Sequence, residues 1–451
     1  MNTHPARGMR DFLPEDVRRR QYVMGVIGDV YQRYGFEPLE TPAVENIETL
    51  MGKYGEEGDR LIFRILKRGG EGKTGDADLA LRYDLTVPLA RVVAQYRGQL
   101  PKFFKRYQVQ PVWRADRPQK GRFREFYQCD VDAIGSTSLV VEAELLGAAA
   151  EVLQRLGFGD FRIRLNHRKL LSGMLRGLQI PTELLGSVLA SLDKFDKVGI
   201  EGVSQELLGR GLKAEIAREL VGFFGDYGPE AFASGEATNA GALEAGWTRF
   251  GGDPEAALAL GELTSLLELC GASTAGDRVQ IDFTLARGLS YYTGAIFEVA
   301  VPDLAGSLGG GGRYDELIGM FLGQRVPACG ISLGLERILV VMGERGMFPP
   351  ELTGAPADVM VTIWNANAAR DAIRLAGELR AAGLRVDVYP EADKIGKQFK
   401  YADARGVRFV TIVGESEAER GDVAVKNLKT GEQQVMPRGA VASFVRKGTG
   451  A

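Results

Sequence analysis

The sequence predicts an α+β protein: a first domain built on an antiparallel sheet with a helical insertion, followed by a small α/β domain. Strand-like runs stand on both sides of a block, at about residues 168–275, whose pattern is helical throughout. A Pro- and Gly-rich stretch at 347–356 is typical of a linker, and strands alternate with helices beyond it. We therefore expect a first domain at 1–346 and a second domain at 357–451.

The composition is that of a globular protein without a disulfide framework. Of 451 residues, 45% are hydrophobic and 25% are charged, close to the averages of about 45–50% and 25%. The three cysteines, Cys129, Cys270 and Cys329, are odd in number and widely spaced, which favours a reducing compartment. Only two histidines are present, too few for a histidine-rich metal site and nearly too few for a histidine-centred triad. We expect His167 to be structural or a surface residue.

The sequence shows no pattern of an export signal or a membrane-spanning segment, which predicts a soluble protein. The N-terminus has no apolar signal segment, and no stretch approaches 18 apolar residues. We expect an unexported, cytoplasmic protein with no membrane partner. The net charge of −3 offers no global attraction to nucleic acid, so a polyanion would have to bind to local patches.

The first half of the chain begins with an amphipathic helix. Apolar residues recur at helical spacing over 14–34, and the segment is opened by Pro14 and closed by Gly35. The next predicted elements are an extended stretch at 36–44, a strand, a turn and a helix within 79–96, strands at 109–114 and 125–134, a helix at 139–157 and a strand at 161–165. The polar loop between the strands at 109–114 and 125–134 is longer than a tight hairpin needs, and long loops are where binding groups concentrate.

The second half returns to strands after the helical block. The predicted elements are strands at 279–285, 294–301 and 328–332 and a helix from about Leu335, and then, in the second domain, strands at 358–364, 384–389 and 407–413 with helices at 366–382 and 395–405. Because strands and helices alternate in the second domain, we expect a parallel sheet with helices packed on it.

A concentration of positive charge lies at Lys102–Arg124, where eight basic residues accompany one acid, Asp116. Arginine presents a planar fork to anionic oxygens, so phosphate is the plausible partner. Aromatic residues are interleaved with these charges, and a purine needs a flat apolar face as well as cations for its phosphates. The alternative is a solvated basic hairpin.

Three further segments have the composition of a ligand site. Gly309–Gly312 are four consecutive glycines between strand-like runs, which favours a ligand floor over a flexible surface turn. Arg287–Gly294 places an arginine beside two tyrosines, a reasonable small-molecule pocket. Arg337 would project from the first turn of a helix, where the alternative role is a surface salt bridge. The Walker-like stretch Gly70–Thr74 lacks the first glycine of a P-loop, so we interpret it as a polar insertion.

These stretches together resemble the class II aminoacyl-tRNA synthetases, and within them the histidyl-tRNA synthetase family. Five ordered segments carry the resemblance: Glu40-Thr-Pro42 (motif 1), Trp113–Phe126 (motif 2), Gly334-Leu-Glu-Arg337 (motif 3), and the two histidine signatures Arg287–Tyr292 and Gly309–Asp315. The substrate loop Leu81–Pro88 fits the version found in eukaryotic-type members. The match runs from about residue 6 to the C-terminus.

The resemblance implies an enzyme, a ligase that activates L-histidine with ATP and transfers it to the 3′ end of tRNA(His). It implies a class II-type catalytic domain, an anticodon-binding domain and a homodimer, with Mg²⁺ accompanying ATP as substrate and no structural metal. Implied catalytic residues are Arg114 and Arg287. The implied histidine-binding residues are Asp84, Thr86, Arg114, Gln128, Asp132, Arg287, Tyr291 and Tyr292, and the implied ATP-binding residues are Arg114, Asp116, Arg122, Phe126 and Arg337.

Some positions depart from the family pattern. Ser290 stands where members usually carry Asp, Asp116 is shorter than the usual Glu, and the insertion at 69–78 is unusual. One rival is the inactive synthetase paralogue that regulates ATP phosphoribosyltransferase; it generally lacks the second domain and the signature arginines, which are present here. Another is a synthetase for threonine, proline or glycine, which the tyrosine pair and the absence of metal-ligand residues disfavour.

Overall fold

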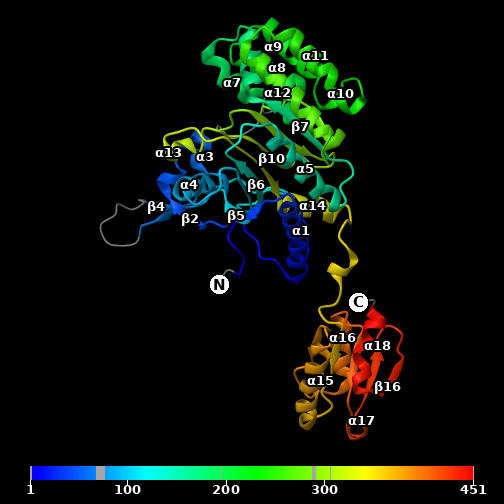
Figure 1. Ribbon diagram of the computed structural model, residues 1–451. Helices are drawn as coiled ribbons and strands as arrows, with labels where there is room; N and C mark the ends of the chain where they lie inside the picture. The colour runs from blue at the N-terminus through cyan, green and yellow to red at the C-terminus, as the bar shows by residue number, and fades with distance from the viewer. Residues whose placement is uncertain (1–2, 68–76, 193–194, 287–290, 305, 450–451) are drawn as a thin grey trace. The chain divides into compact units, whose positions relative to one another are not determined.

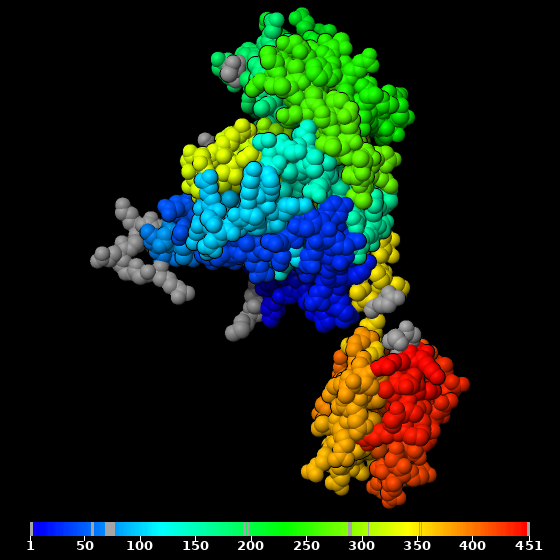
Figure 2. All heavy atoms as spheres, viewed as in Figure 1, coloured from blue at the N-terminus to red at the C-terminus, as the bar shows by residue number. Residues whose placement is uncertain are grey.

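The computed structural model describes residues 3–67, 77–192, 195–286, 291–304 and 306–449. The described chain falls into two compact units, Met1–Phe348 and Pro349–Ala451, each considered by itself below. Figure 1 traces the elements in chain order, and Figure 2 gives the surface of each unit.

An eight-stranded sheet forms the centre of the first unit, in the order β1-β5-β6-β11-β10-β9-β7-β8. The outer pairs β1·β5 and β7·β8 are parallel, and every pair between them is antiparallel. The strands are β1 (Glu37–Pro38), β5 (Phe104–Trp113), β6 (Glu125–Ile134), β7 (Arg162–His167), β8 (Val279–Ile281), β9 (Ala295–Ala300), β10 (Ser307–Arg313) and β11 (Ala328–Gly334). The largely antiparallel sheet confirms the predicted fold class.

Three helices pack together against one face of this sheet: α1 (Pro14–Arg33), α5 (Val140–Arg155) and α14 (Leu335–Glu344). Ile27 of α1, Leu145 of α5 and Val131 of β6 are fully buried in one apolar cluster. Because side chains alternate along a strand, β6 sends Cys129, Val131 and Ala133 into this cluster and its even-numbered residues to the opposite face. That opposite face carries the polar residues described below.

A small second sheet, in the order β2-β4-β3, accompanies the large one. Its strands are β2 (Val44–Asn46), β3 (Arg64–Leu66) and β4 (Ala77–Leu81), and the helices of this region are α2 (Ile47–Leu50), α3 (Gly55–Arg60), α4 (Thr86–Tyr96) and α13 (Gly319–Leu322). A separate apolar cluster that includes Leu50, Leu89 and Tyr314 holds this region together.

The helical insertion follows β7 directly and returns to the sheet at β8. It contains α6 (Arg168–Gly177), α7 (Thr182–Leu192), α8 (Phe195–Gly209), α9 (Ala214–Asp226), α10 (Pro229–Ser234), α11 (Asn239–Phe250), α12 (Pro254–Gly271) and the short 3₁₀ turn η1 (Gly276–Arg278). Figures 1 and 2 show it in green as a lobe of its own on the first unit. His167 starts it: its Nδ1 accepts from the Lys169 backbone N–H at 3.1 Å, and its Nε2 lies 2.9 Å from Glu262 Oε2 of α12. The predicted structural role of His167 is confirmed.

The second unit is a five-stranded sheet with helices on both faces, in the order β13-β12-β14-β15-β16. Its strands are β12 (Val359–Val361), β13 (Val386–Val388), β14 (Phe409–Ile412), β15 (Asp422–Asn427) and β16 (Gln433–Pro437), and its helices are η2 (Pro350–Thr353), η3 (Ala366–Ala368), α15 (Ala369–Ala381), α16 (Ile395–Ala404), α17 (Glu415–Arg420), η4 (Arg438–Ala440) and α18 (Val441–Thr449). Val359 packs in the cluster with α15 and α18, whereas its neighbour Met360 packs with Ala402 of α16.

Two expectations need correction. The sheet of the second unit is mixed: β12 pairs in parallel with β13 and β14, but β14·β15 and β15·β16 are antiparallel. A strand that returns through a short turn can only pair antiparallel, as β16 does after β15. The glycine segment was not predicted as a strand, yet it forms β10 between β9 and β11.

Candidate active site

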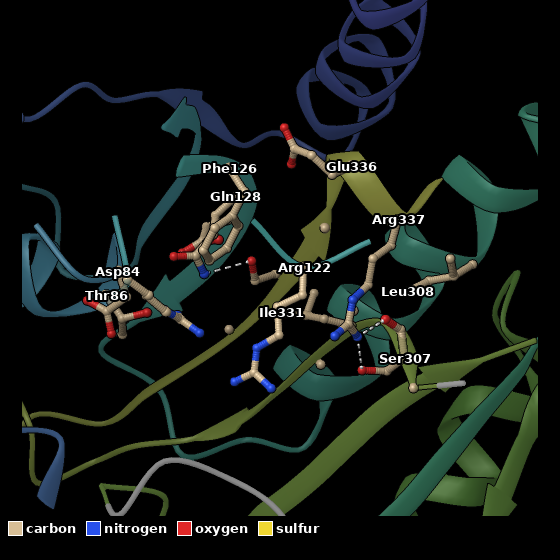
Figure 3. A pocket seen from close by; sticks show the side chains of 18 of the residues that line it. Asp84, Thr86, Arg122, Phe126, Gln128, Ser307, Leu308, Ile331, Glu336 and Arg337 are labelled. Carbon is tan, nitrogen blue, oxygen red and sulfur yellow. Dashed lines mark hydrogen bonds between the residues drawn. The ribbon is translucent and has the colours of Figure 1, made fainter. Parts of the chain in front are cut away.

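A cavity of about 760 Å³ lies over the polar face of the large sheet. Its size is typical of small-molecule sites, which span about 300–1,000 Å³. The lining includes eleven of the twelve residues that the sequence placed in the site: Asp84, Thr86, Arg114, Asp116, Arg122, Phe126, Gln128, Asp132, Tyr291, Tyr292 and Arg337. The twelfth, Arg287, lies outside the described residues, as do Ser290 and the Walker-like stretch 70–74. In Figure 3, Asp84 and Thr86 lie on one side of the cavity and Arg337 with Ser307 on the other.

A stripe of polar side chains crosses the three central strands beneath the cavity. On β6 its members are Gln128, Asp130 and Asp132, which share one face because they are two residues apart. The register places Arg106, Gln108 and Gln110 of β5 beside them on one side, and Gly330, Ser332 and Gly334 of β11 on the other. Gln128 Nε2 donates to Ser332 Oγ at 3.0 Å, while the buried Gln128 Oε1 accepts no hydrogen bond from any described residue. This face therefore presents acceptors to a ligand.

Asp84 closes one end of the cavity just before α4. Its Oδ1 accepts from the Val87 N–H and from the Tyr54 hydroxyl, both at 3.0 Å, and the Tyr291 hydroxyl donates to Oδ2 at 3.3 Å. Burial nonetheless raises the pKa of the Asp84 carboxyl above its usual value, against the lowering effect of these bonds and of the Arg114 charge. A buried carboxylate held this way is suited to receive an ammonium group.

Asp132 lies deeper, beside a fully buried arginine. The Tyr314 hydroxyl donates to Asp132 Oδ1 at 2.5 Å, and Arg106 Nη2 lies 2.9 Å from Oδ2. Burial raises the pKa of Asp132, whereas the Arg106 charge and the Tyr314 hydroxyl act to lower it. Gly330 makes room for this carboxyl, because a Cβ there would lie 2.5 Å from Asp132 Cγ and would collide with Oδ1.

Two arginines reach the cavity from distant segments. Arg114 follows β5; its Nε donates to the Tyr83 carbonyl at 3.0 Å, and its guanidinium lies over the rings of Tyr83 and Phe126 at 4.3 and 5.2 Å from their centroids. Arg337 projects from the first turn of α14, and its Nη1 donates to the Ser307 carbonyl at 2.5 Å. These contacts fix Arg114 near Asp84, whose pKa its charge acts to lower, and Arg337 on the opposite side of the cavity.

The loop between β5 and β6 carries a bidentate ion pair. Arg122 Nε and Nη2 donate to the two oxygens of Asp116 at 3.0 and 2.9 Å. Asp116 therefore holds Arg122 in place, a role that the sequence did not predict for it. Phe123 and Phe126 contribute aromatic surface at the same end of the cavity.

The glycines of β10 form part of the floor. Gly309 and Gly310 line the cavity, and a Cβ on Gly312 would lie 3.0 Å from the Tyr292 ring. The main chain of β10 is thus exposed to the cavity at Gly309 and Gly310. The ligand floor that the four glycines indicate stays a prediction.

Other groups lie apart from the cavity. The three cysteines are buried and unpaired. No group of three or more His, Cys, Asp or Glu within the described ranges is arranged to hold a metal ion, and no helix in those ranges is long and apolar enough to cross a bilayer.

Sequence reasoning missed Asp130, Arg106, Tyr54 and Tyr314. The signal for Asp130 was available, because a period of two from Gln128 to Asp132 passes through it. Tyr314 lies in the signature segment Gly309–Asp315, although its contact with Asp132 was not predicted. Tyr54 carries no comparable signal, since its approach to Asp84 depends on tertiary packing.

A largely antiparallel sheet with a cavity lined by Arg114, Arg122 and Arg337, followed by a separate α/β unit, is the architecture of a class II aminoacyl-tRNA synthetase. The family model of histidyl-tRNA synthetase matches residues 8–338, and that of the anticodon-binding domain matches residues 358–448. The chain belongs to the histidyl-tRNA synthetase family.

Relatives share nearly the whole length of the chain. It is 42% identical over 445 residues to the histidine–tRNA ligase of Christiangramia forsetii, with 95% of each chain covered, and 42% identical over 465 residues to that of Gloeobacter violaceus, with 97% of each covered. The crystal structure of histidyl-tRNA synthetase from Nostoc sp. PCC 7120 superposes with a TM-score of 0.80 over 99% of both chains, at 32% identity. An ATP phosphoribosyltransferase regulatory subunit/histidyl-tRNA synthetase from Bacillus halodurans C shares the fold at 23% identity and a TM-score of 0.72, covering 88% of this chain and 96% of its own.

Proposed function

We propose that this protein is a histidine–tRNA ligase that forms histidyl-adenylate from L-histidine and Mg·ATP and then charges tRNA(His). The observation that carries the proposal is that one cavity joins buried carboxylates, with Arg114 near them, at one end to Arg337 at the other. An amino acid and a nucleotide could occupy these ends together. Full-length similarity to histidine–tRNA ligases supports the same reaction.

Activation is an in-line displacement. A histidine carboxylate oxygen forms a bond to the α-phosphorus of ATP, and the bond from that phosphorus to pyrophosphate breaks. The reacting groups are both anionic, so positioned cations lower the barrier without a protein nucleophile. We propose that Arg114 and Arg287 neutralise the α-phosphate, that Arg337 and Arg122 hold the phosphate chain, and that adenine stacks on Phe126.

Histidine selection falls to the opposite end. We propose that Asp84 and Thr86 receive the α-amino group, while Gln128, Asp132 and the two tyrosines Tyr291 and Tyr292 surround the ring. A site built from buried hydrogen-bonding groups can reject analogues that lack the matching group by about 10⁴–10⁵-fold, because its polar atoms would be left unpaired.

Transfer then moves the histidyl group to RNA. A ribose hydroxyl at the 3′ end of tRNA(His) attacks the carbonyl carbon, and AMP leaves with the phosphate oxygen. We propose that residues 357–451 bind the anticodon, that the motif 1-like segment contributes to a homodimer, and that the protein acts in the cytoplasm. The three buried, unpaired cysteines are compatible with a reducing compartment.

The experiment is ATP–pyrophosphate exchange with the purified chain, run with each of the twenty amino acids. We expect exchange with histidine alone, loss of it in Arg114→Ala, and little change in the control Arg33→Ala, whose side chain is half exposed on α1. Exchange supported by another amino acid would refute the assignment. No exchange with any amino acid would favour the regulatory paralogue.

A further inference from the structure

Asp130 lies in the middle of the polar stripe and has no role in the reaction described so far. It stands on β6 between Gln128 and Asp132, opposite Gln108 of β5 and Ser332 of β11. Its side chain lines the cavity although the residue is only 2% exposed. The Oδ1 atom is buried and has no hydrogen-bond partner among the described residues. A buried, unpartnered carboxylate oxygen is costly unless a ligand completes it.

The charges around Asp130 are not balanced. Arg106 is the nearest cation, but its Nη2 lies 3.9 Å from Asp130 Oδ2 and only 2.9 Å from Asp132 Oδ2. The same guanidinium also donates to Gln108 Oε1 at 3.1 Å and to the Leu85 carbonyl at 3.3 Å. One buried arginine therefore faces two carboxylates and contacts Asp132 more closely. Asp130 is left as the acceptor without a close cation.

The spacing of the two carboxylates suits a protonated imidazole. Residues two apart on a strand are separated by about 6.6 Å. The two ring nitrogens of an imidazolium both donate, in divergent directions, and hydrogen bonds of about 2.8 Å from each span about 7 Å between the two acceptors. A neutral imidazole has one donor and one acceptor, so it could satisfy only one of the two carboxylates when both are ionised.

We propose that Asp130 is a second ring-binding residue and that the substrate histidine is held as an imidazolium, with one ring N–H donated to Asp130 and the other to Asp132. The inference rests on the proposed function, and it adds the charge state of the bound substrate. The net result is that histidine binding takes up a proton at a pH above the pKa values of Asp130 and of free histidine.

The titratable groups around Asp130 support this proton balance. Burial and the charge of Asp132 raise the pKa of Asp130 to about 7, against the lowering effects of Arg106 and the Ser332 side chain. The groups that interact with Asp130 from the surrounding elements are Arg106 on β5, Cys129 and Asp132 on β6, Ser332 on β11, Asp84 before α4, Arg82 after β4, Tyr31 on α1 and Tyr292 before β9. Burial raises the pKa values of the thiol and the two phenols in this set, so they are neutral. Asp130 and the carboxyls of Asp84 and Asp132 therefore face two arginines, and the field at Asp130 favours an added positive charge.

The test is calorimetric titration of the full chain with L-histidine at pH 8, in two buffers of different ionisation enthalpy. Free imidazole, with a pKa of about 6.5, is almost wholly neutral at that pH, so the wild type should take up most of one proton per bound histidine. In Asp130→Asn the uptake should fall by at least half, and histidine should bind roughly 10–100-fold more weakly. Asp130→Glu, which keeps the charge, should retain the uptake.

The same proteins allow the specific controls. The wild-type KM for histidine should rise towards tenfold per pH unit above about pH 7.5, because the complex holds a proton that the separated partners lack. The profile of Asp130→Asn should be flatter, with the KM for Mg·ATP within twofold of wild type. Asp160→Asn, a half-exposed carboxylate paired with Arg345, should behave as the wild type.

The outcomes separate the two proposals. Wild-type protein that binds histidine without taking up a proton overturns the inference, even if Asp130→Asn fails to fold. Unchanged uptake and affinity in a folded Asp130→Asn overturn it as well. Wild-type protein that binds no histidine removes the proposed function and this inference with it.

Discussion

Replacing Gly330 by alanine tests whether the position of Asp132 sets histidine recognition. The added Cβ would lie 2.5 Å from Asp132 Cγ, about 1 Å inside a normal contact distance for carbon atoms. The carboxyl must therefore move by about 1 Å, which disrupts its contacts with Arg106 at 2.9 Å and Tyr314 at 2.5 Å. A hydrogen bond to a charged group is worth about 1.5–3 kcal/mol. Loss of one such bond to the ring corresponds to a roughly 10–100-fold weaker interaction with histidine.

The assay is histidine-dependent ATP–pyrophosphate exchange at varied histidine and at varied ATP. We expect Gly330→Ala to raise the KM for histidine by about 10–100-fold and to leave the KM for ATP within about threefold. The matched control is Gly28→Ala on α1, where no atom lies within 4 Å of the new Cβ. A KM for histidine within twofold of wild type, in a protein of unchanged melting temperature, would refute the reasoning.

Three other predictions concern the phosphate end, the buried charges and the thiols. Arg337→Ala should lower kcat/KM for ATP by about 10²-fold, because it removes a positioned cation, and Arg337→Lys should recover part of the loss. Equal values in the wild type and the two variants would contradict a role of Arg337 in ATP binding. Arg106→Met should lower the free energy of unfolding of the first unit by about 3–5 kcal/mol at pH 8. The loss should be smaller at pH 6, because without Arg106 the folded-state pKa values of Asp130 and Asp132 lie further above their unfolded values and the penalty for ionising them grows as the pH rises. Equal losses in urea unfolding at the two pH values would contradict this. Burial raises the pKa of the thiols of Cys129, Cys270 and Cys329, so a thiol reagent should label all three only after unfolding, and rapid labelling of the native chain would argue against their burial.

Much of the fold could be predicted because local pattern and tertiary environment agree. Glu125–Ile134 is a strand over the predicted range, and the first helix ends one residue before its predicted limit. Both have one face in the apolar core, which is what imposes a clear period on a sequence. The glycine segment has no side chains to show a period, so only its proximity to a ligand was predictable and its pairing as β10 was not.

The candidate site was predictable in membership more than in contacts. Eleven of the residues that the motif resemblance named line one cavity. The resemblance did not predict that Asp116 pairs with Arg122 or that Arg106 is buried beside two acids. Such contacts join residues through strand register and loop conformation, which a single sequence does not encode in any local signal. The roles assigned to individual residues therefore stay predictions that the assays above address.

The glycine floor has a consequence for redesigning the enzyme. A Cβ at Gly309 would collide with the Ser332 carbonyl of β11, and a Cβ at Gly310 would lie 3.2 Å from the Phe297 carbonyl oxygen of β9, so a side chain at either position would disturb the sheet before it could add a recognition group. Directed evolution towards an unnatural amino acid should therefore randomise cavity-lining positions of β6, which β11 separates from β10, and leave the glycines fixed. A library with side chains at Gly309 and Gly310 would consist mostly of proteins in which the pairing of β10 is disturbed.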